Sequence, residues 1–307
     1  MNAPVSGDVT LSVIVAAKDA ETLIEDCLTS VLPQLRPGDD IVVIDDRSCD
    51  ATAEICARLG VRLLLNSHAP GPYGARNLGA ALATTTALVF FDTRCRALDG
   101  WLESHRDALR DADRPVISYS DIEVEQTPDI AAAIARHLNP FSVGTYARVG
   151  FYPACNLGVG RELFWQAGGF EEIRGGADAG LCFRATAMGA HFVVDRQTRV
   201  RWRPRATFRA LQGQYRRYGT SKYRLRTDRV PLLVLDTAVF LPLRALGTFI
   251  GKPSSRASLR ARIGAGIVQA NFESAILRAA LSDCASALRR RWPRDTRWST
   301  HSGSGGI

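Results

Sequence analysis

The sequence lacks the paired cysteines that would indicate a zinc site or a disulfide framework. Its 7 cysteines are scattered over 307 residues, and none belongs to a Cys-x-x-Cys pair. Scattered, unpaired cysteines are typical of a reducing compartment, so we expect a cytoplasmic protein. The first residues also lack a basic stretch followed by an apolar run, and we therefore expect no signal peptide.

Two further absences narrow the class of protein. The chain has neither a Gly-x-Gly-x-x-Gly fingerprint nor a Walker A pattern, which argues against dehydrogenases and P-loop enzymes. The most apolar window, residues 231–250, is interrupted by Asp236, Pro242 and Arg244. Its uninterrupted apolar length falls short of the ~20 residues that span a bilayer. A buried or membrane-surface helix is therefore a better interpretation of this window than a membrane span.

Acidic residues are scarce in the C-terminal third of the chain. Residues 201–307 hold 21 lysines and arginines but only 5 aspartates and glutamates, whereas residues 1–200 hold 18 and 26. This asymmetry indicates an anionic partner, such as a membrane surface, a diphosphate substrate or nucleic acid. No helix-turn-helix, RNA-recognition or zinc-finger spacing accompanies the charge, which argues against nucleic acid. A solvated basic face without a dedicated partner is the alternative.

What the sequence does contain is a repeated alternation of apolar runs and amphipathic segments. We expect strands at 11–17, 41–44, 61–65, 87–91, 115–119, 154–160, 192–194 and 200–202. Helices are expected to end near residues 31, 59 and 83, and to cover 101–109, 161–167, 181–188, 208–225 and 255–291. Strands separated by helices predict an α/β fold with a mostly parallel central sheet and helices on both faces.

Carboxylates terminate two of the predicted strands. Asp45 and Asp46 follow the strand at 41–44, and Asp92 ends the apolar run at 87–91. Open α/β sheets bind their ligands at the carboxyl ends of their strands, so this pattern favours a nucleotide-binding edge. Taken alone, each aspartate is also explained as the cap of a turn.

Eight short motifs, in order between residues 10 and 225, resemble those of family 2 glycosyltransferases of the GT-A fold. They are Ser12-Val-Ile-Val-Ala-Ala-Lys-Asp19, Val43-Ile-Asp-Asp-Arg-Ser48, Gly74-Ala-Arg-Asn77, Phe91-Asp-Thr-Arg-Cys95, Asn156-Leu-Gly-Val159, Gly168-Gly-Phe170, Asp178 with Leu181-Cys-Phe-Arg184, and Gln214-Tyr-Arg-Arg-Tyr-Gly219. The resemblance implies a Rossmann-like GT-A domain over 9–225. It leaves 226–291 as a helical, basic and apolar extension and 292–307 as a disordered tail.

The resemblance also implies an activity and a site. Family members move a sugar from a nucleotide-diphosphate donor to an acceptor hydroxyl or amine, with inversion at the anomeric carbon. Asp178 matches the general base. Donor nucleotide and diphosphate contacts are expected from Ala17, Asp19, Asp45, Asp46, Arg76, Asp92, Arg94, Arg216 and Arg217. Asn156 and Trp202 are the candidates for contacts with the acceptor.

Three departures from the family pattern concern the diphosphate and its metal. Arg94 replaces a second carboxylate, only Asp178 remains of an acidic cluster, and Trp202 stands where relatives often have a histidine. The family implies a divalent metal, Mg²⁺ or Mn²⁺, at Asp92. Asp92 could hold the metal with water and donor phosphates, or arginines could replace its charge. The candidate arginines are Arg94, Arg201, Arg203, Arg216 and Arg217, and we hypothesise weak or no metal dependence.

The identity of the acceptor and two other functions stay open. The basic third and the apolar window suggest a lipid-linked acceptor and peripheral contact with the inner face of the membrane, with a soluble natural-product aglycone as the alternative. A catalytically degenerate GT-A domain that binds a nucleotide or a partner is a second candidate function. A GT-A scaffold used for a different group transfer is a third. Four lone histidines, His68, His105, His137 and His191, are interpreted as loop or surface residues.

Overall fold

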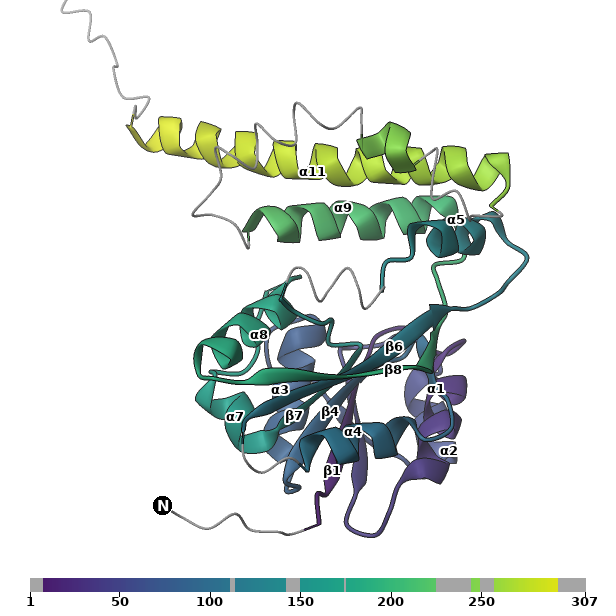
Figure 1. The fold of residues 1–307 in the computed structure, drawn as a ribbon, viewed down its shortest axis with the longest axis vertical. Coiled ribbons are helices and arrows are strands. Elements are labelled where there is room, and N and C mark those ends of the chain that lie inside the picture. The colour runs from purple at the N-terminus through teal and green to yellow at the C-terminus, as the bar shows by residue number, and fades with distance from the viewer. Residues whose placement is uncertain are drawn as a thin grey trace, which may run out of the picture.

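The computed structural model describes residues 8–110, 114–141, 150–173, 175–224, 244–248 and 257–291. In this part of the chain, an α/β body carries a layer of helices beyond one edge of its sheet (Figure 1). The predicted tail, 292–307, and most of the apolar window, 231–250, lie outside the described residues. The predicted division of the chain near residue 225 therefore stays a prediction.

One sheet organises the α/β body, with strand order β3-β2-β1-β4-β7-β6-β8-β5. The strands are β1 Leu11–Ala17, β2 Asp40–Asp45, β3 Arg62–Leu65, β4 Ala87–Asp92, β5 Cys95–Ala97, β6 Val116–Val124, β7 Asn156–Gly160 and β8 His191–Trp202. Strands β1 to β4 pair in parallel, as do β6 and β8, whereas β7 and β5 pair antiparallel to their neighbours. The predicted α/β fold with a mostly parallel central sheet is confirmed.

Helices cover both faces of this sheet. The helices are α1 Ile24–Val31, α2 Thr52–Arg58, α3 Pro72–Leu82, α4 Trp101–Leu109, α5 Ile130–Leu138, α7 Arg161–Gln166, α8 Ala177–Ala187, α9 Phe208–Arg224 and α11 Leu259–Arg291. Gly79 of α3 packs against Ile14, whereas α4 packs against Gly158 through His105. Gly158 pairs with Val89, and Val89 pairs with Val13, so Gly158 and Val13 face the same side of the sheet. Ile14 follows Val13 in β1 and therefore faces the opposite side. Helices α3 and α4 therefore lie on opposite faces.

Two features differ from the sequence-based expectation. Strand β8 is continuous over residues that we expected to form two short strands, because it pairs with β6 along its length. The register of this pairing shifts between Ser120 and Ile122, opposite the polar stretch in the middle of β8. Beyond the shift the two strands pair again as far as Val124 and Trp202. Strand β5, which has three residues, and helix α5, which begins at the N-cap Asp129, were not among the expected elements.

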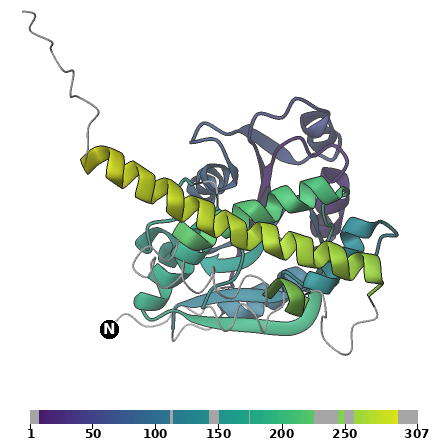
Figure 2. The same cartoon turned by 90° about the horizontal axis from the view of Figure 1, so that it is seen from above.

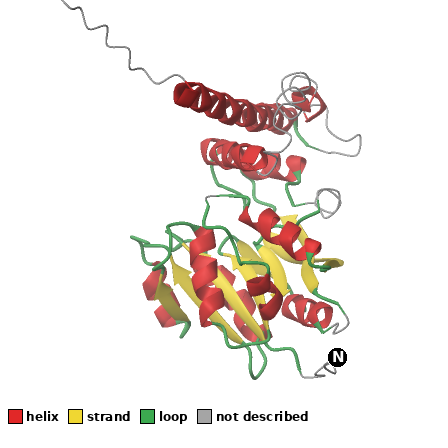
Figure 3. Ribbon diagram, turned by 90° about the vertical axis from the view of Figure 1, so that its left-hand side faces the viewer, coloured by secondary structure: helices red, strands yellow, loops and turns green. Residues whose placement is uncertain are grey.

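Helices α9 and α11 form the outer layer, which Figures 2 and 3 show stacked beyond the sheet. The two helices approach closely at Gly219, where any Cβ would overlap the carbonyl oxygen of Phe272. Helix α11 also packs on α5, and its Ala261, Ala265 and Val268 are fully buried. No helix in the described part of the chain has both the length and the apolar character needed to cross a membrane.

Candidate active site

The carboxyl ends of β1, β2 and β4 bring three predicted site residues together. Ala17 pairs with Asp45, and the neighbouring Ala16 pairs with Asp92, so these residues lie side by side at one edge of the sheet. Helix α9 lies beyond the same edge (Figure 1). The arrangement is that of a ligand site at the carboxyl ends of parallel strands.

The aspartates beside β1 and β2 are already held by hydrogen bonds within the protein. Asp45 accepts bonds from the backbone N–H of Ser48 at 3.1 Å and from its hydroxyl at 2.5 Å. Asp46 accepts bonds from the backbone N–H of Gly71 at 2.9 Å and from the Asn66 amide at 2.8 Å. Asp19 adopts a φ of 45° and accepts a bond from the N–H of residue 49 at 2.9 Å. These carboxylates fix the loops of the site before any ligand arrives.

Arg76 on α3 is a buried cation with an unused hydrogen-bond donor. Its side chain is 5% exposed, and its guanidinium lies 5.4 Å from the centre of the Tyr73 ring. Within the described residues, its buried Nε has no hydrogen-bond partner. A buried donor without a partner is costly, so this nitrogen points to a ligand acceptor such as a base carbonyl or a phosphate oxygen.

Asp178 lies in the first turn of α8, where the helix N-terminus stabilises a negative charge. Its carboxylate accepts hydrogen bonds from the N–H of Ala154 at 3.2 Å and of Ala179 at 3.0 Å. Burial raises the pKa of the Tyr73 hydroxyl, and the nearby charge of Asp178 raises it further. The base candidate and the Arg76–Tyr73 pair therefore lie close together.

Tyr218 on α9 is near enough to Asp92 and Asp178 for both charges to act on its hydroxyl, and sequence reasoning assigned it no role. Its hydroxyl accepts a hydrogen bond from the Gln214 amide at 2.6 Å. The residue as a whole is 38% exposed. Burial of the hydroxyl raises the pKa of Tyr218, the Gln214 hydrogen bond lowers it, and the charges of Asp92 and Asp178 raise it further. The spacing of Gln214 and Tyr218, one helical turn apart in the last family-like motif, was the signal that could have identified the pair.

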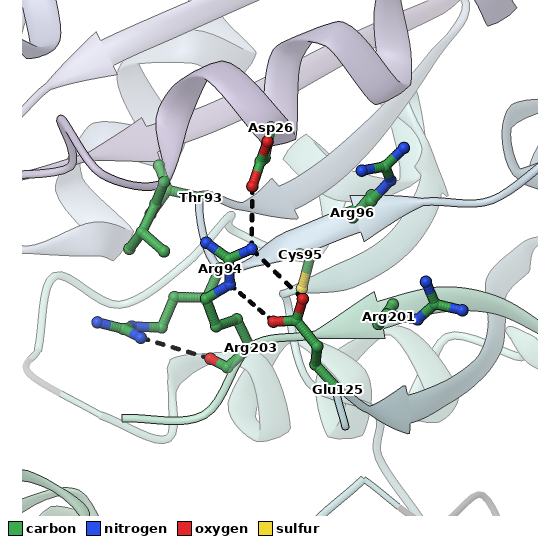
Figure 4. A pocket seen from close by; sticks show the side chains of 9 residues that line it. Asp26, Thr93, Arg94, Cys95, Arg96, Glu125, Arg201 and Arg203 are labelled. Atoms are coloured by element: carbon green, nitrogen blue, oxygen red, sulfur yellow. Dashed lines mark hydrogen bonds and ion pairs between the residues drawn. The ribbon is translucent and has the colours of Figure 1, made fainter. Parts of the chain in front are cut away.

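Arg94 turns from the end of β4 towards the end of β8. Its backbone N–H donates to Asp92 Oδ1 at 2.9 Å, and its guanidinium donates to the carbonyls of Arg203 at 3.4 Å and Pro204 at 3.2 Å. Figure 4 shows this side chain beside a small pocket. Burial lowers the pKa of Arg94 to about 10, and the charge of Arg205 adds to the effect.

Most of the other candidate arginines are engaged elsewhere. Arg201 pairs with Glu123 at 2.7 Å. Arg203 bridges Glu125 at 2.7 Å and Asp26 at 2.9 Å, as Figure 4 shows. Arg216 donates to the amide oxygen of Asn271 on α11 at 3.3 Å, which turns it away from the strand ends. Arg217 is exposed on α9. The donor contact expected from Arg216 therefore stays a prediction.

The two candidates for acceptor contacts, Asn156 and Trp202, belong to the protein interior. Asn156 is fully buried, accepting a bond from the Trp101 indole at 2.7 Å and donating to the Ser120 carbonyl at 2.8 Å. Trp202 is 2% exposed and packs edge-on against Phe141. Both acceptor assignments are therefore corrected, because neither side chain reaches a surface. The sequence motifs identify residues that match the family pattern, but they do not show whether the side chains are exposed.

His105 also differs from the expectation of a loop or surface residue. It is 1% exposed and lies between the Ser118 hydroxyl at 2.7 Å and the Asn156 amide oxygen at 3.0 Å. Burial lowers the pKa of His105 to about 4. Histidine is therefore part of the polar core between α4, β6 and β7.

The residues around Asp92 do not build a metal cage from protein ligands. Among the described residues, no three His, Cys, Asp or Glu side chains come together as a metal site would require. Asp92 is a single carboxylate, one of its oxygens accepts the N–H of Arg94, and a guanidinium stands two residues on. Mg²⁺ sites also take water and substrate phosphates as ligands, so Asp92 could hold such a metal together with the donor.

Comparisons with known proteins agree with this geometry. The fold is similar to that of a mannosyltransferase from Pyrobaculum calidifontis solved with GDP-Man and Mn²⁺, with a TM-score of 0.52 and 17% identity over 91% of this chain and 74% of that one. The architecture is thus that of the GT-A glycosyltransferases. Residues 12–146 match the sequence profile of glycosyl transferase family 2.

Two curated relatives have glycosyltransferase names. The pre-mycofactocin glycosyltransferase of Mycobacterium tuberculosis is 26% identical over 231 residues, which cover 70% of this chain and 49% of the relative. The amylovoran biosynthesis glycosyltransferase AmsB of Erwinia amylovora is 26% identical over 212 residues, which cover 61% of this chain and 67% of the relative. The match thus spans about half the length of the mycobacterial protein.

Proposed function

We propose that the chain is an inverting glycosyltransferase that moves a sugar from a nucleotide-diphosphate donor to an acceptor hydroxyl or amine. The observation that carries this proposal is that Asp178 accepts a hydrogen bond from Ala154, two residues before Asn156, which pairs with Phe91 beside Asp92. The proposed diphosphate contact and the proposed general base thus lie at the neighbouring ends of β4 and β7. The match to family 2 over residues 12–146 supports the same reaction class.

In this proposal the donor nucleoside lies against β1, β2 and α3. Carboxylate oxygens of Asp19, Asp45 and Asp46 have lone pairs beyond their internal bonds and can accept bonds from base N–H groups or ribose hydroxyls. The buried Nε of Arg76 donates to the base or to a phosphate oxygen. Asp92 then lies at the diphosphate, at the end of the neighbouring strand.

Asp178 acts as the general base in this scheme. Its carboxylate takes the proton from the acceptor O–H or N–H while the acceptor atom bonds to the anomeric carbon. The bond between that carbon and the phosphate oxygen breaks, and its electron pair leaves with the nucleoside diphosphate. The bonds from Ala154 and Ala179 hold the carboxylate in place. One base acting opposite the leaving group gives inversion.

The test of this function uses a panel of UDP-, GDP- and dTDP-sugars. Slow donor hydrolysis should appear with at least one of them, and proton NMR should find that an α-linked donor first releases the β-anomer. Release of the α-anomer would contradict inversion. Binding of a nucleotide without any turnover would instead favour the degenerate, nucleotide-binding alternative.

The acceptor side is proposed to face a membrane that carries anionic lipid. Leu259, Ile263 and Ile267 of α11 are 63%, 47% and 43% exposed and follow one another at four-residue spacing, so they form an apolar stripe on one helix face. Arg260 and Arg278 are exposed along the same stripe. An apolar stripe flanked by arginines fits an anionic bilayer surface, which would place the enzyme near lipid-linked acceptors.

Co-sedimentation with vesicles tests the stripe. Binding to vesicles of phosphatidylglycerol and phosphatidylcholine should weaken at high salt and be lost in Ile263→Glu, because the charge cannot enter the lipid interface. The matched control is Leu65→Glu on β3, a leucine that is also 63% exposed. If both variants bind vesicles like the wild type, the proposed membrane contact is wrong and a soluble acceptor is favoured.

A further inference from the structure

Shortly after β8 lies an arginine, Arg205, that has no ion-pair partner in the described part of the chain. Arg205 follows Pro204, whose carbonyl accepts the Arg94 guanidinium. Within the described residues, Arg205 forms no ion pair, and its Nε is buried without a hydrogen-bond partner. A guanidinium nitrogen removed from water and left unbonded is costly, so the site needs an acceptor that the chain does not supply.

Arg94, whose guanidinium reaches the same site from β4, also lacks an ion-pair partner among the residues that the structure describes. In the described part of the chain its guanidinium bonds to two neutral carbonyls and no carboxylate, and the carboxylate closest in sequence, Asp92, accepts the Arg94 backbone N–H. The charge of Arg205 acts on Arg94 from nearby. Two guanidinium groups at close range repel each other unless an anion lies between them.

The arginines next to this pair show what a balanced arrangement looks like. Arg203, between them in sequence, is neutralised by Glu125 and Asp26, and Arg201 is neutralised by Glu123. Figure 4 shows the Arg203 guanidinium turned towards its two carboxylates while that of Arg94 points the other way. Among the described residues, Arg201 and Arg203 thus have carboxylate partners, whereas Arg94 and Arg205 form no ion pair.

We propose that Arg94 and Arg205 together bind the diphosphate of the donor and supply the positive charge that a divalent metal supplies elsewhere in the fold. This inference rests on the proposed glycosyltransferase function. Guanidinium groups bind phosphate oxygens through paired N–H donors, and a diphosphate offers oxygens to two such groups at once. As the bond to the sugar breaks, the growing charge on the leaving phosphate oxygen strengthens these bonds.

The experiment is titration calorimetry in excess EDTA with UDP, GDP and dTDP, and with the matching nucleosides. The wild type should bind at least one nucleoside diphosphate without metal. Arg205→Gln should weaken that affinity about 10- to 100-fold, since it removes hydrogen bonds to a charged group. The affinity for the nucleoside alone should not change.

The control is Arg96→Gln, which removes an exposed arginine from β5, two residues from Arg94, and should change the affinity less than twofold. Melting curves verify folding, and Arg205→Lys, which keeps the charge, should lose less affinity than Arg205→Gln. Equal effects of Arg205→Gln and Arg96→Gln would overturn the inference, as would wild-type binding that requires Mg²⁺ or Mn²⁺. If the wild type binds neither nucleosides nor diphosphates even with metal, the proposed function fails and this inference fails with it.

Discussion

The two halves of the donor site differ in how complete they are without a ligand. In the nucleoside half, Asp45 and Asp46 already accept backbone and side-chain hydrogen bonds. In the diphosphate half, as far as the structure describes the chain, the Arg94 guanidinium has carbonyl partners only and the buried Nε of Arg205 has none. Apart from the unbonded Nε of Arg76, the nucleoside half is held by bonds within the fold, whereas the arginines of the diphosphate half form no ion pair among the described residues.

This difference indicates that the two halves contribute differently to folding and to binding. Residues of the nucleoside half should contribute to folding as well as to binding, because their removal leaves buried donors unpaired. Residues of the diphosphate and acceptor half, which includes Asp178, should contribute little to folding and much to binding or turnover. Strained or uncompensated groups of this kind gather at functional sites.

The largest expected effect is on turnover, from Asp178→Asn. The amide keeps an oxygen for the Ala154 N–H but no longer accepts a proton, so donor-dependent transfer should fall about 10²- to 10⁴-fold. Calorimetry should find nucleotide affinity nearly unchanged. Glu171→Gln, at an exposed carboxylate paired with Arg184 of the same helix, is the control and should keep full activity. Normal turnover in Asp178→Asn would show that another group is the base.

A stability comparison tests the contrast directly. Asp46→Ala leaves the Gly71 N–H and the Asn66 amide without their acceptor and should lower the free energy of unfolding by about 2 to 4 kcal/mol. Asp92→Ala loses one bond from the Arg94 backbone and should cost less than about 1 kcal/mol. Urea unfolding measures both. Similar losses in the two variants would contradict this difference between the two halves.

Low pH should lower the folding stability of the buried core around His105. The pKa of buried His105 is lowered to about 4 in the folded protein from 6.5 in the exposed side chain. The stability that this difference contributes is complete above pH 6.5 and is lost as the pH falls towards 4, up to about 3 kcal/mol. Urea unfolding of the wild type and His105→Gln over this range isolates the contribution. A wild type whose stability follows that of the variant at every pH would show that His105 is not the cause.

The smallest effect is expected at Arg216. Its guanidinium bonds to Asn271 on the outer layer and not to the strand ends, so Arg216→Ala should change stability by less than about 1 kcal/mol. Nucleotide affinity in EDTA should stay within twofold of the wild type. A loss of affinity as large as that of Arg205→Gln would mean that Arg216, contrary to this account, also binds the nucleotide.

Much of the α/β body could be predicted because its strands are buried on both faces and read as continuous apolar runs. The strand at 11–17 agrees residue for residue with β1, and the helix at 101–109 with α4. The site residues were harder to predict, because residue type and spacing do not show whether a side chain is buried. Asn156 and Trp202 look like contact residues in sequence but lie in the core. Arg205 became notable only once the carboxylates beside its neighbours could be seen.

Phosphorus NMR of a bound nucleoside diphosphate in excess EDTA tests the central claim most directly. UDP, GDP and dTDP are each added to the wild type and to Arg205→Gln, and the β-phosphorus resonance is followed. We predict that the wild type shifts this resonance without metal and that Arg205→Gln abolishes most of the shift. A shift that appears only when Mg²⁺ is added, and is the same in both proteins, would contradict an arginine-bound diphosphate.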